Sequence, residues 1–141
     1  ERGLEGHSDA DALLHAIMDA LLGAAGLDDI GHHFPTDDER FRHASSLKLL
    51  AEVRRMLAAE GWRPINVDST VIAEQPKLAP FLSKMKKAVG ETVGIVETAV
   101  GIKVTTNEKL GFLGRGEGIA AMAVALLARA EVQDLEEQIG G

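Results

Sequence analysis

The sequence predicts one α+β domain in which helices are interleaved with strands. A chain of 141 residues with 45% hydrophobic side chains is long enough to bury one compact core and requires no second domain. Some segments place apolar residues at helical spacing, and others are rich in β-branched residues that alternate between two faces. Together these observations predict the fold class.

Composition argues against several classes of protein. The net charge is −7 at pH 7, and no stripe of Lys and Arg offsets it, which argues against a nucleic-acid binder. The chain has no Cys, so a zinc site would have to use His and carboxylate ligands. No apolar run approaches the roughly 20 residues of a membrane span, and nothing resembles a signal peptide. We therefore expect a soluble, intracellular protein.

The first predicted helix begins near Asp9 and ends before Gly26. Ser8 followed three residues later by Asp11 approximates a capping box, with Asp in the position where Glu or Gln is usual. A glycine after the last apolar turn is a typical helix stop. Between these limits nearly every residue is Ala, Leu, Ile or Met.

Three polar residues of this helix, Asp11, His15 and Asp19, recur at i, i+4 and i+8 and so lie on one line of an apolar cylinder. Burying them requires a charged partner. A divalent metal is one candidate, because an imidazole with a nearby carboxylate is a common zinc arrangement. The more usual alternative is a solvated or hydrogen-bonded stripe. His7 lies just before the predicted cap, where free backbone N–H groups attract phosphate.

A polar segment and a second helix follow. Residues 27–38 are dense in turn formers, and we expect them to form a loop that is either a solvated connector or the wall of a site. Ser45 or Ser46 then caps a helix that ends at Gly61.

Two strands are predicted, over 66–73 and 98–106, because both segments are rich in β-branched residues. A third helix from Pro80 to about Val89 separates them. The residues expected to share one face of each strand are Val67, Ser69, Val71 and Ala73 in the first, and Val100, Ile102 and Val104 in the second.

A glycine-rich stretch, residues 105–118, is the second informative segment. Its glycines let the backbone come close to a ligand, and Arg115 can bind phosphate oxygens in a fork. The spacing fits neither a Walker loop nor a dinucleotide-binding loop, so the motif alone leaves phosphate binding open. A helix rich in Ala and Leu is predicted from Ile119, followed by an acidic tail over 131–141 that we expect to fray.

Five motifs together resemble the 2-C-methyl-D-erythritol 2,4-cyclodiphosphate synthase family, which acts in non-mevalonate isoprenoid synthesis. The resemblance covers nearly the whole chain, in the order of the family, and the joint occurrence of the motifs is far more specific than any one of them. The motifs are Gly6-His7-Ser8-Asp9-Ala10-Asp11 with His15, Asp29-Ile30-Gly31 before Phe34-Pro35, Ala73-Glu74-Gln75-Pro76-Lys77, Thr105 to Phe112, and Gly114-Arg115-Gly116-Glu117-Gly118.

The resemblance implies an activity and an assembly. The reaction is the metal-dependent cyclisation of 4-diphosphocytidyl-2-C-methyl-D-erythritol 2-phosphate, with release of CMP. The implied domain, residues 1–141, has helices packed on one face of a mixed sheet, and the sheets of three subunits face the axis of a homotrimer. Each active site lies between subunits. No nucleic acid or membrane is involved, and the expected location is the bacterial cytoplasm or the plastid stroma.

The resemblance also implies roles for residues that handle phosphate and metal. His7, Ser8 and Thr106 match catalytic residues that hold and orient phosphate. His15 matches a zinc ligand on the helix. Glu108 matches a ligand of a second divalent ion, which is magnesium or manganese.

Substrate pockets are implied in the same way. The pocket for the erythritol hydroxyls matches Asp29 and Gly31, and the loop from Phe34 to Asp38 is its flexible wall. The cytidine pocket and the adjoining diphosphate site match Ala73, Pro76, Lys77, Leu78 and Thr105. Residues that match the lining of an axial cavity, in which isoprenoid diphosphates bind, are Phe112, Arg115 and Glu117.

Two departures from the family are visible. The family places an Asp-x-His pair of zinc ligands on a strand near its N-terminus, and no Asp-x-His occurs here, so we expect this chain to lack that strand. With His15 as the remaining zinc ligand, zinc affinity should be poor. Val104 is bulkier than the Ala expected near the nucleotide.

Two alternatives to the synthase remain open at this point. One is a truncated, non-catalytic trimer that binds nucleotide or isoprenoid diphosphate. Metal analysis distinguishes it from the enzyme, which should hold about one zinc per subunit. The other is an unrelated phosphate-binding domain, which would not explain why the motifs occur together.

Overall fold

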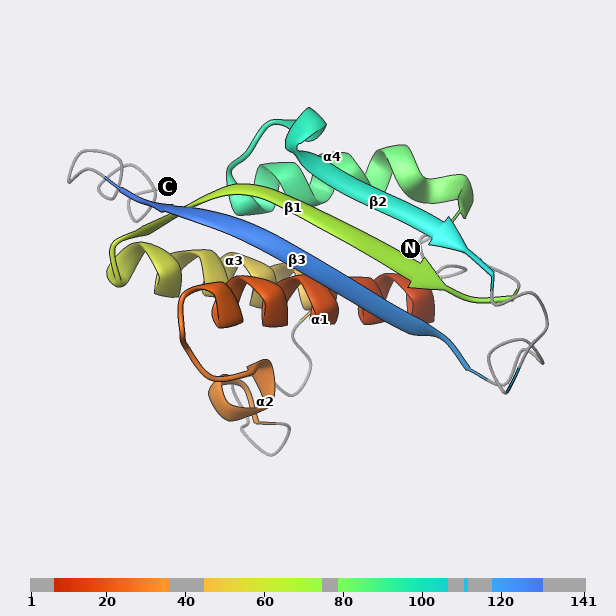
Figure 1. The fold of residues 1–141 in the computed structure, drawn as a ribbon, viewed down its shortest axis with the longest axis horizontal. Helices are drawn as coiled ribbons and strands as arrows, with labels where there is room; N and C mark the ends of the chain where they lie inside the picture. Colours follow the sequence, from red (N-terminus) through yellow and green to blue (C-terminus); the bar gives the residue numbers. More distant parts are fainter. Residues whose placement is uncertain (1–6, 36–44, 75–78, 107–110, 112–117, 131–141) are drawn as a thin grey trace.

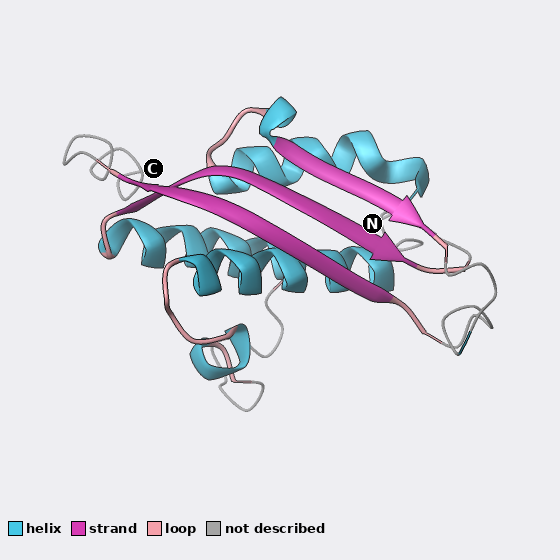
Figure 2. Ribbon diagram, in the orientation of Figure 1, coloured by secondary structure: helices cyan, strands magenta, loops and turns pink. Residues whose placement is uncertain are grey.

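The computed structural model describes residues 7–35, 45–74, 79–106, 111 and 118–130. The chain has the predicted α+β fold: across these residues three strands form one mixed sheet, and the long helices pack together on one face of it (Figures 1 and 2).

The sheet has the order β2-β1-β3. The central strand β1 (Trp62–Ile72) runs parallel to β2 (Val100–Thr105) and antiparallel to β3 (Ala120–Arg129). β1 starts earlier than predicted, and the register with β3 shifts just after Pro64. A proline has no N–H for the ladder, so an irregularity beside it is expected. The two predicted strands are confirmed, and the structure shows that they are parallel neighbours whose carboxyl ends meet at one edge.

The third strand corrects a prediction, because the segment from Ile119 is not a helix. Its Ala and Leu residues have high helix propensity, but pairing with β1 along its whole length overrides that local preference. The sequence does carry a period of two that the prediction overlooked. Small residues that pack toward the core alternate with larger exposed ones; they are Ala121, Ala123 and Ala125 against Met122, Val124 and Leu126.

In the described ranges four α-helices accompany the sheet: α1 (His7–Ala24), α2 (Ile30–His33), α3 (Ser46–Ala59) and α4 (Leu82–Val93). α1 packs against β3, β1 and α3, and α3 packs in turn against α4. The side chains that α1 buries almost completely are Leu13, Leu14, Ile17, Met18, Leu21 and Leu22. Within the described residues, no helix is long and apolar enough to cross a bilayer.

The helix ends largely follow the predicted stop and start signals. Gly26 and Gly61 have φ of 74° and 86° and follow α1 and α3, as expected of glycines that close helices. Ser45 caps α3, and its side chain accepts the Lys48 N–H at 3.2 Å. α1 differs, since it begins at His7 and the predicted cap Ser8 therefore lies in its first turn.

The connection between β1 and β2 is more helical than predicted. A 3₁₀ turn, Ala79–Phe81, precedes α4, and α4 continues four residues past the predicted end. Gly94 then stops it with φ of 87°. A second 3₁₀ turn, Glu97–Ala99, leads into β2.

The two faces of the sheet differ in character. The face toward the helices buries the predicted side chains of β1, including Val67, Ser69 and Val71 at 0–2% exposure. On the other face Met122, Val124 and Leu126 are 59%, 68% and 55% exposed. No described helix packs on that second face, in front of which Figure 2 shows open space. An ion pair between Lys103 Nζ and Asp68 Oδ1 at 2.5 Å lies beside the apolar side chains.

Candidate functional site

Five of the predicted site residues that the structure describes fall into two groups at opposite ends of the domain. One group, the α2 group, consists of Asp29 and Gly31. It lies at the start of α2, the short helix that follows the C-terminal end of α1 (Figure 1). The other group, the strand-end group, consists of Ala73, Thr105 and Thr106. It lies at the carboxyl ends of β1 and β2, at the end of the domain where α1 begins (Figure 1). α1 has 18 residues; at 1.5 Å per residue such a helix is about 27 Å long. Within one chain the two groups are therefore far apart.

Parallel pairing brings the second group together. The Ala73 N–H donates to the Thr105 carbonyl oxygen at 3.0 Å, which places the end of β1 directly beside the end of β2. Ala73 is 2% exposed, whereas Thr105 and Thr106 are both exposed. Carboxyl ends of parallel strands are a common place for ligands, because the chain leaves the sheet there and exposes backbone groups. Thr105 Oγ1 donates to the Thr106 carbonyl oxygen at a long 3.5 Å. Two exposed threonines at this edge fit the handling of phosphate.

The stripe on α1 has two kinds of residue. Its carboxylates bond to neighbouring helices: Asp11 Oδ1 accepts from Ser46 Oγ at 2.9 Å, and Asp19 Oδ1 accepts from the Ile30 N–H at 3.0 Å. His15 lies between them and is exposed. The alternative of a hydrogen-bonded stripe is thus confirmed for the carboxylates of Asp11 and Asp19, while the imidazole of His15 remains accessible to a ligand.

The segment expected to be a loop contains the short helix α2. Asp29 caps it, since Asp29 Oδ1 accepts the His32 N–H at 3.0 Å. Among the residues that the structure describes, a Cβ atom at Gly31 would contact only Asp29 Oδ1, at 3.6 Å, so this glycine leaves space beside the cap. Phe34 follows α2 and is 8% exposed, so its ring packs in the hydrophobic core and anchors the start of the predicted pocket wall.

The described residues do not complete a metal site. They contain no group of three or more His, Asp or Glu side chains arranged to hold an ion. Structural and catalytic zinc sites use three or four protein ligands. In the described part of the chain His15 is thus a single candidate ligand rather than part of a finished site.

Several predicted residues lie outside the described part of the chain. The predicted fraying of residues 131–141 falls there too. Of His7 and Ser8 only the place on α1 is described. The predicted site residues outside the description are Asp38, Pro76, Lys77, Leu78, Glu108, Phe112, Arg115 and Glu117.

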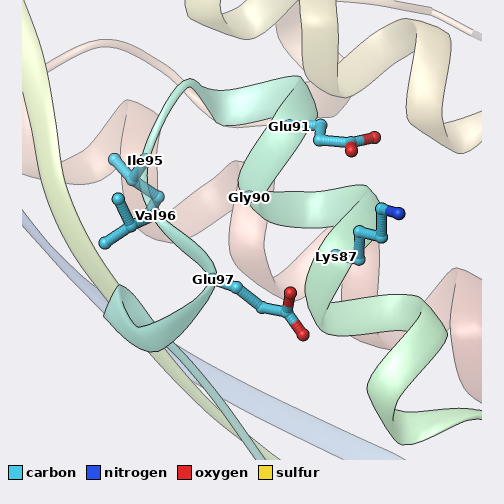
Figure 3. Close-up of a pocket in the computed structure, with 6 residues that line it drawn as sticks. All are labelled: Lys87, Gly90, Glu91, Ile95, Val96 and Glu97. Carbon is cyan, nitrogen blue, oxygen red and sulfur yellow. The ribbon is translucent and has the colours of Figure 1, made fainter.

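One surface hollow of ≈ 270 Å³ lies elsewhere, between α4 and the segment that follows it (Figure 3). It exists because Gly90 lets the chain return close to the helix: a Cβ there would lie 2.9 Å from the Ile95 carbonyl oxygen. No predicted site residue lines it, and the residues that do are Lys87, Gly90, Glu91, Ile95, Val96 and Glu97. We therefore place the candidate site at the two groups described above.

Sequence reasoning missed the bond between Asp19 and Ile30. The residues are 11 positions apart and belong to different helices. The polar stripe marked Asp19 as unusual, but only the position of α2 identifies its partner.

The chain matches the model of the YgbB family over residues 1–128. It is 59% identical over 128 residues to the 2-C-methyl-D-erythritol 2,4-cyclodiphosphate synthase of Symbiobacterium thermophilum, covering 91% of this chain and 82% of that protein. It is 58% identical over 127 residues to the synthase of the same name from Halorhodospira halophila, covering 90% and 78%.

Solved structures agree with the sequence relatives. The fold matches the bifunctional IspDF from Campylobacter jejuni with a TM-score of 0.80 at 39% identity, over 85% of this chain and 32% of that longer one. It also matches IspF of Plasmodium falciparum, solved as a CDP complex, with a TM-score of 0.71 at 31% identity, over 84% and 70% of the two chains.

Proposed function

The chain belongs to the YgbB family, whose relatives named above are 2-C-methyl-D-erythritol 2,4-cyclodiphosphate synthases, and on that premise we propose how its residues act. The protein converts 4-diphosphocytidyl-2-C-methyl-D-erythritol 2-phosphate to 2-C-methyl-D-erythritol 2,4-cyclodiphosphate. An oxygen of the 2-phosphate bonds to the β-phosphorus of the same molecule. The bond between that phosphorus and the oxygen bridging to the α-phosphate breaks, and CMP leaves with the bridging oxygen.

The protein acts as a homotrimer in which each active site combines the α2 group of one subunit with the strand-end group of the next. The observation that carries this proposal is the separation of the two groups by the length of α1, about 27 Å, which exceeds the reach of one small substrate. The exposed apolar side chains of β3, which include Val124 at 68% exposure, supply a surface for subunit contact. A trimer that buries this face brings strand ends and α2 segments of different copies together.

The α2 group binds the erythritol part of the substrate. Asp29 uses Oδ1 to cap its own helix, so its other carboxylate oxygen can accept a bond from a hydroxyl. The open space beside Gly31 lets that hydroxyl approach the backbone. The loop from Phe34 to Asp38 forms the flexible wall of this pocket.

The strand-end group binds the cytidine and the diphosphate. The small side chain of Ala73 leaves room for the base, and the pocket is completed by Pro76, Lys77 and Leu78. The hydroxyls of Thr105 and Thr106 donate to diphosphate oxygens. At the start of the 18-residue α1, His7, Ser8 and backbone N–H groups of the first turn hold the 2-phosphate.

Catalysis by this arrangement is mainly positioning. Both reacting phosphates are anionic, and no side chain has to form a covalent bond with the substrate. Holding the two phosphates of one substrate molecule in a ring-forming geometry overcomes their mutual repulsion and favours the intramolecular attack. A chain without Cys is compatible with that chemistry.

We propose two divalent ions, zinc with His15 as one ligand and magnesium or manganese with Glu108 as another. Cations there would neutralise the repulsion between the phosphates. The described residues supply one imidazole for zinc and not its other ligands. An axial cavity with Phe112, Arg115 and Glu117 would take an isoprenoid diphosphate, and the expected cytoplasmic or plastid location stays a prediction.

The test is release of CMP from the diphosphocytidyl substrate by the protein made from its complete coding sequence, with zinc and magnesium present. We expect CMP and the cyclic diphosphate in equal amounts, and no CMP after chelation. A protein that assembles as a trimer, binds CDP and yet releases no CMP would contradict the proposal. That result would instead fit the non-catalytic alternative, which relatives 53–59% identical and named as synthases do not favour.

A further inference from the structure

Asp19 joins the end of α1 to the beginning of α2. Its Oδ1 atom accepts the backbone N–H of Ile30, the first residue of α2, at 3.0 Å. The first N–H groups of a helix have no partner within the helix, and Asp29 already accepts another of them, from His32. Two carboxylates therefore share the N-terminus of α2, one from the segment itself and one from α1.

α2 depends on such outside contacts for its position. It has four residues, and helices this short are not stable alone. Phe34, at its far end, is fixed by burial in the core. The bond from Asp19 fixes the near end, immediately beside Asp29 and Gly31. With both ends held, α2 has a defined orientation on α1, from which it projects in Figure 1.

We propose that Asp19 is a positioning residue for substrate: by accepting the Ile30 N–H it sets the orientation of Asp29 and Gly31 toward the erythritol hydroxyls. This inference rests on the proposed function, because it concerns the same α2 group. Asp19 itself touches no substrate. It also lies one turn beyond His15, so it ties the α2 group to the helix face that carries the candidate metal ligand.

The useful property of Asp19 is its hydrogen-bond acceptor and not its charge. Asp28 and Asp29 already make the neighbourhood acidic, and His32 Nε2 lies 3.4 Å from Asp28 Oδ2. A further negative charge does not help to bind an anionic substrate. An asparagine, which keeps an Oδ1 acceptor without the charge, should therefore replace it with little loss.

Three variants test the proposal: Asp19→Ala removes the acceptor, Asp19→Asn keeps it, and Asp28→Ala removes a nearby exposed carboxylate that bonds no α2 backbone N–H. We expect Asp19→Ala to lower kcat/KM for CMP release by about 10- to 100-fold, because small misplacements of binding groups are costly. Asp19→Asn should stay within about threefold of the unchanged protein, since the bond is kept. Asp28→Ala should do the same, as expected of an exposed surface substitution.

A second measurement separates positioning from a general loss of structure. CDP lacks the erythritol group and binds the strand-end group of the neighbouring subunit, so its affinity, measured by calorimetry, should change less than about twofold in Asp19→Ala. Equal losses of CDP affinity and kcat/KM would overturn the proposal, as would equal losses in Asp19→Ala and Asp19→Asn, or no loss in Asp19→Ala.

Hydrogen exchange keeps this test independent of the proposed function. The Ile30 amide should be protected in the unchanged protein and in Asp19→Asn, and should exchange faster in Asp19→Ala. If the unchanged protein releases no CMP, the proposed function fails while the exchange result still reports the bond. If the Ile30 amide exchanges at the same rate in all three proteins, the positioning proposal fails whatever the activity.

Discussion

Leu126→Asp is expected to dissociate the trimer while leaving each subunit folded. Leu126 lies on the face of the sheet that no described helix covers, and it is 55% exposed in the single chain. Its partner across the strands is Asn66, which is uncharged, so the new carboxylate does not oppose a like charge within its own sheet. The helix-facing core is on the other side and is not disturbed.

The size of the effect follows from that exposure. Full burial of a leucine side chain stabilises by about 2–3 kcal/mol. The exposed 55% of Leu126 therefore contributes about 1–1.5 kcal/mol per subunit when a neighbouring copy covers it. A carboxylate buried there without a partner costs about 3 kcal/mol more. Because three copies are affected, we expect a loss of about 10 kcal/mol or more for the trimer, enough to dissociate it at micromolar concentration.

Sedimentation velocity and CMP release measure the outcome, and Val96→Asp is the matched control. Val96 is 69% exposed but lies in the connection after α4, away from the sheet face. We expect Leu126→Asp to sediment as a species of 15.0 kDa with unchanged helical circular dichroism and no activity. Val96→Asp should remain trimeric and active. A Leu126→Asp protein that stays trimeric and active would refute the reasoning, as would a Val96→Asp protein that dissociates equally.

Three further predictions concern single residues. Gly94→Ala should lower stability by about 1–3 kcal/mol in thermal unfolding, because Gly94 has φ of 87° and a Cβ would lie 2.5 Å from Arg54. Its control is Gly23→Ala, in open space within α1, and an equal loss there would contradict the explanation. Ser69→Ala should cost about 1 kcal/mol in denaturant unfolding, because its buried hydroxyl donates to a β2 carbonyl at 2.8 Å; no loss would be inconsistent with that bond. His15→Ala should lower bound zinc in elemental analysis by about tenfold, whereas unchanged zinc would remove His15 from the ligand set.

Much of the fold could be predicted because several elements carry strong local patterns. α1 and α3 have apolar residues at helical spacing and end at glycines, and the β-branched residues of β1 place Val67 and Val71 on the buried face. β3 could not be predicted from propensity, because Ala and Leu favour a helix until β1 supplies a partner strand. α2 was missed for a similar reason, since one turn of helix has no period of its own.

The site was predictable as a set of motifs but not as a geometry. The resemblance pairs Ala73 with Thr105, and only parallel pairing of β1 with β2 explains why they touch. The stripe on α1 was visible, but its carboxylates turned out to bond Ser46 and Ile30, which are remote in the sequence. Contacts of this kind depend on how helices pack, and spacing along one helix does not encode them.

The most direct test of the shared active site is complementation between two inactive variants. Asp29→Ala damages the α2 group, and Thr106→Ala damages the strand-end group. If each site takes one group from each of two subunits, trimers formed from an equal mixture should have about a quarter of their sites intact and recover about that share of the activity. If both groups of a site belong to one subunit, the mixture stays as inactive as either variant alone, and that result would contradict the account.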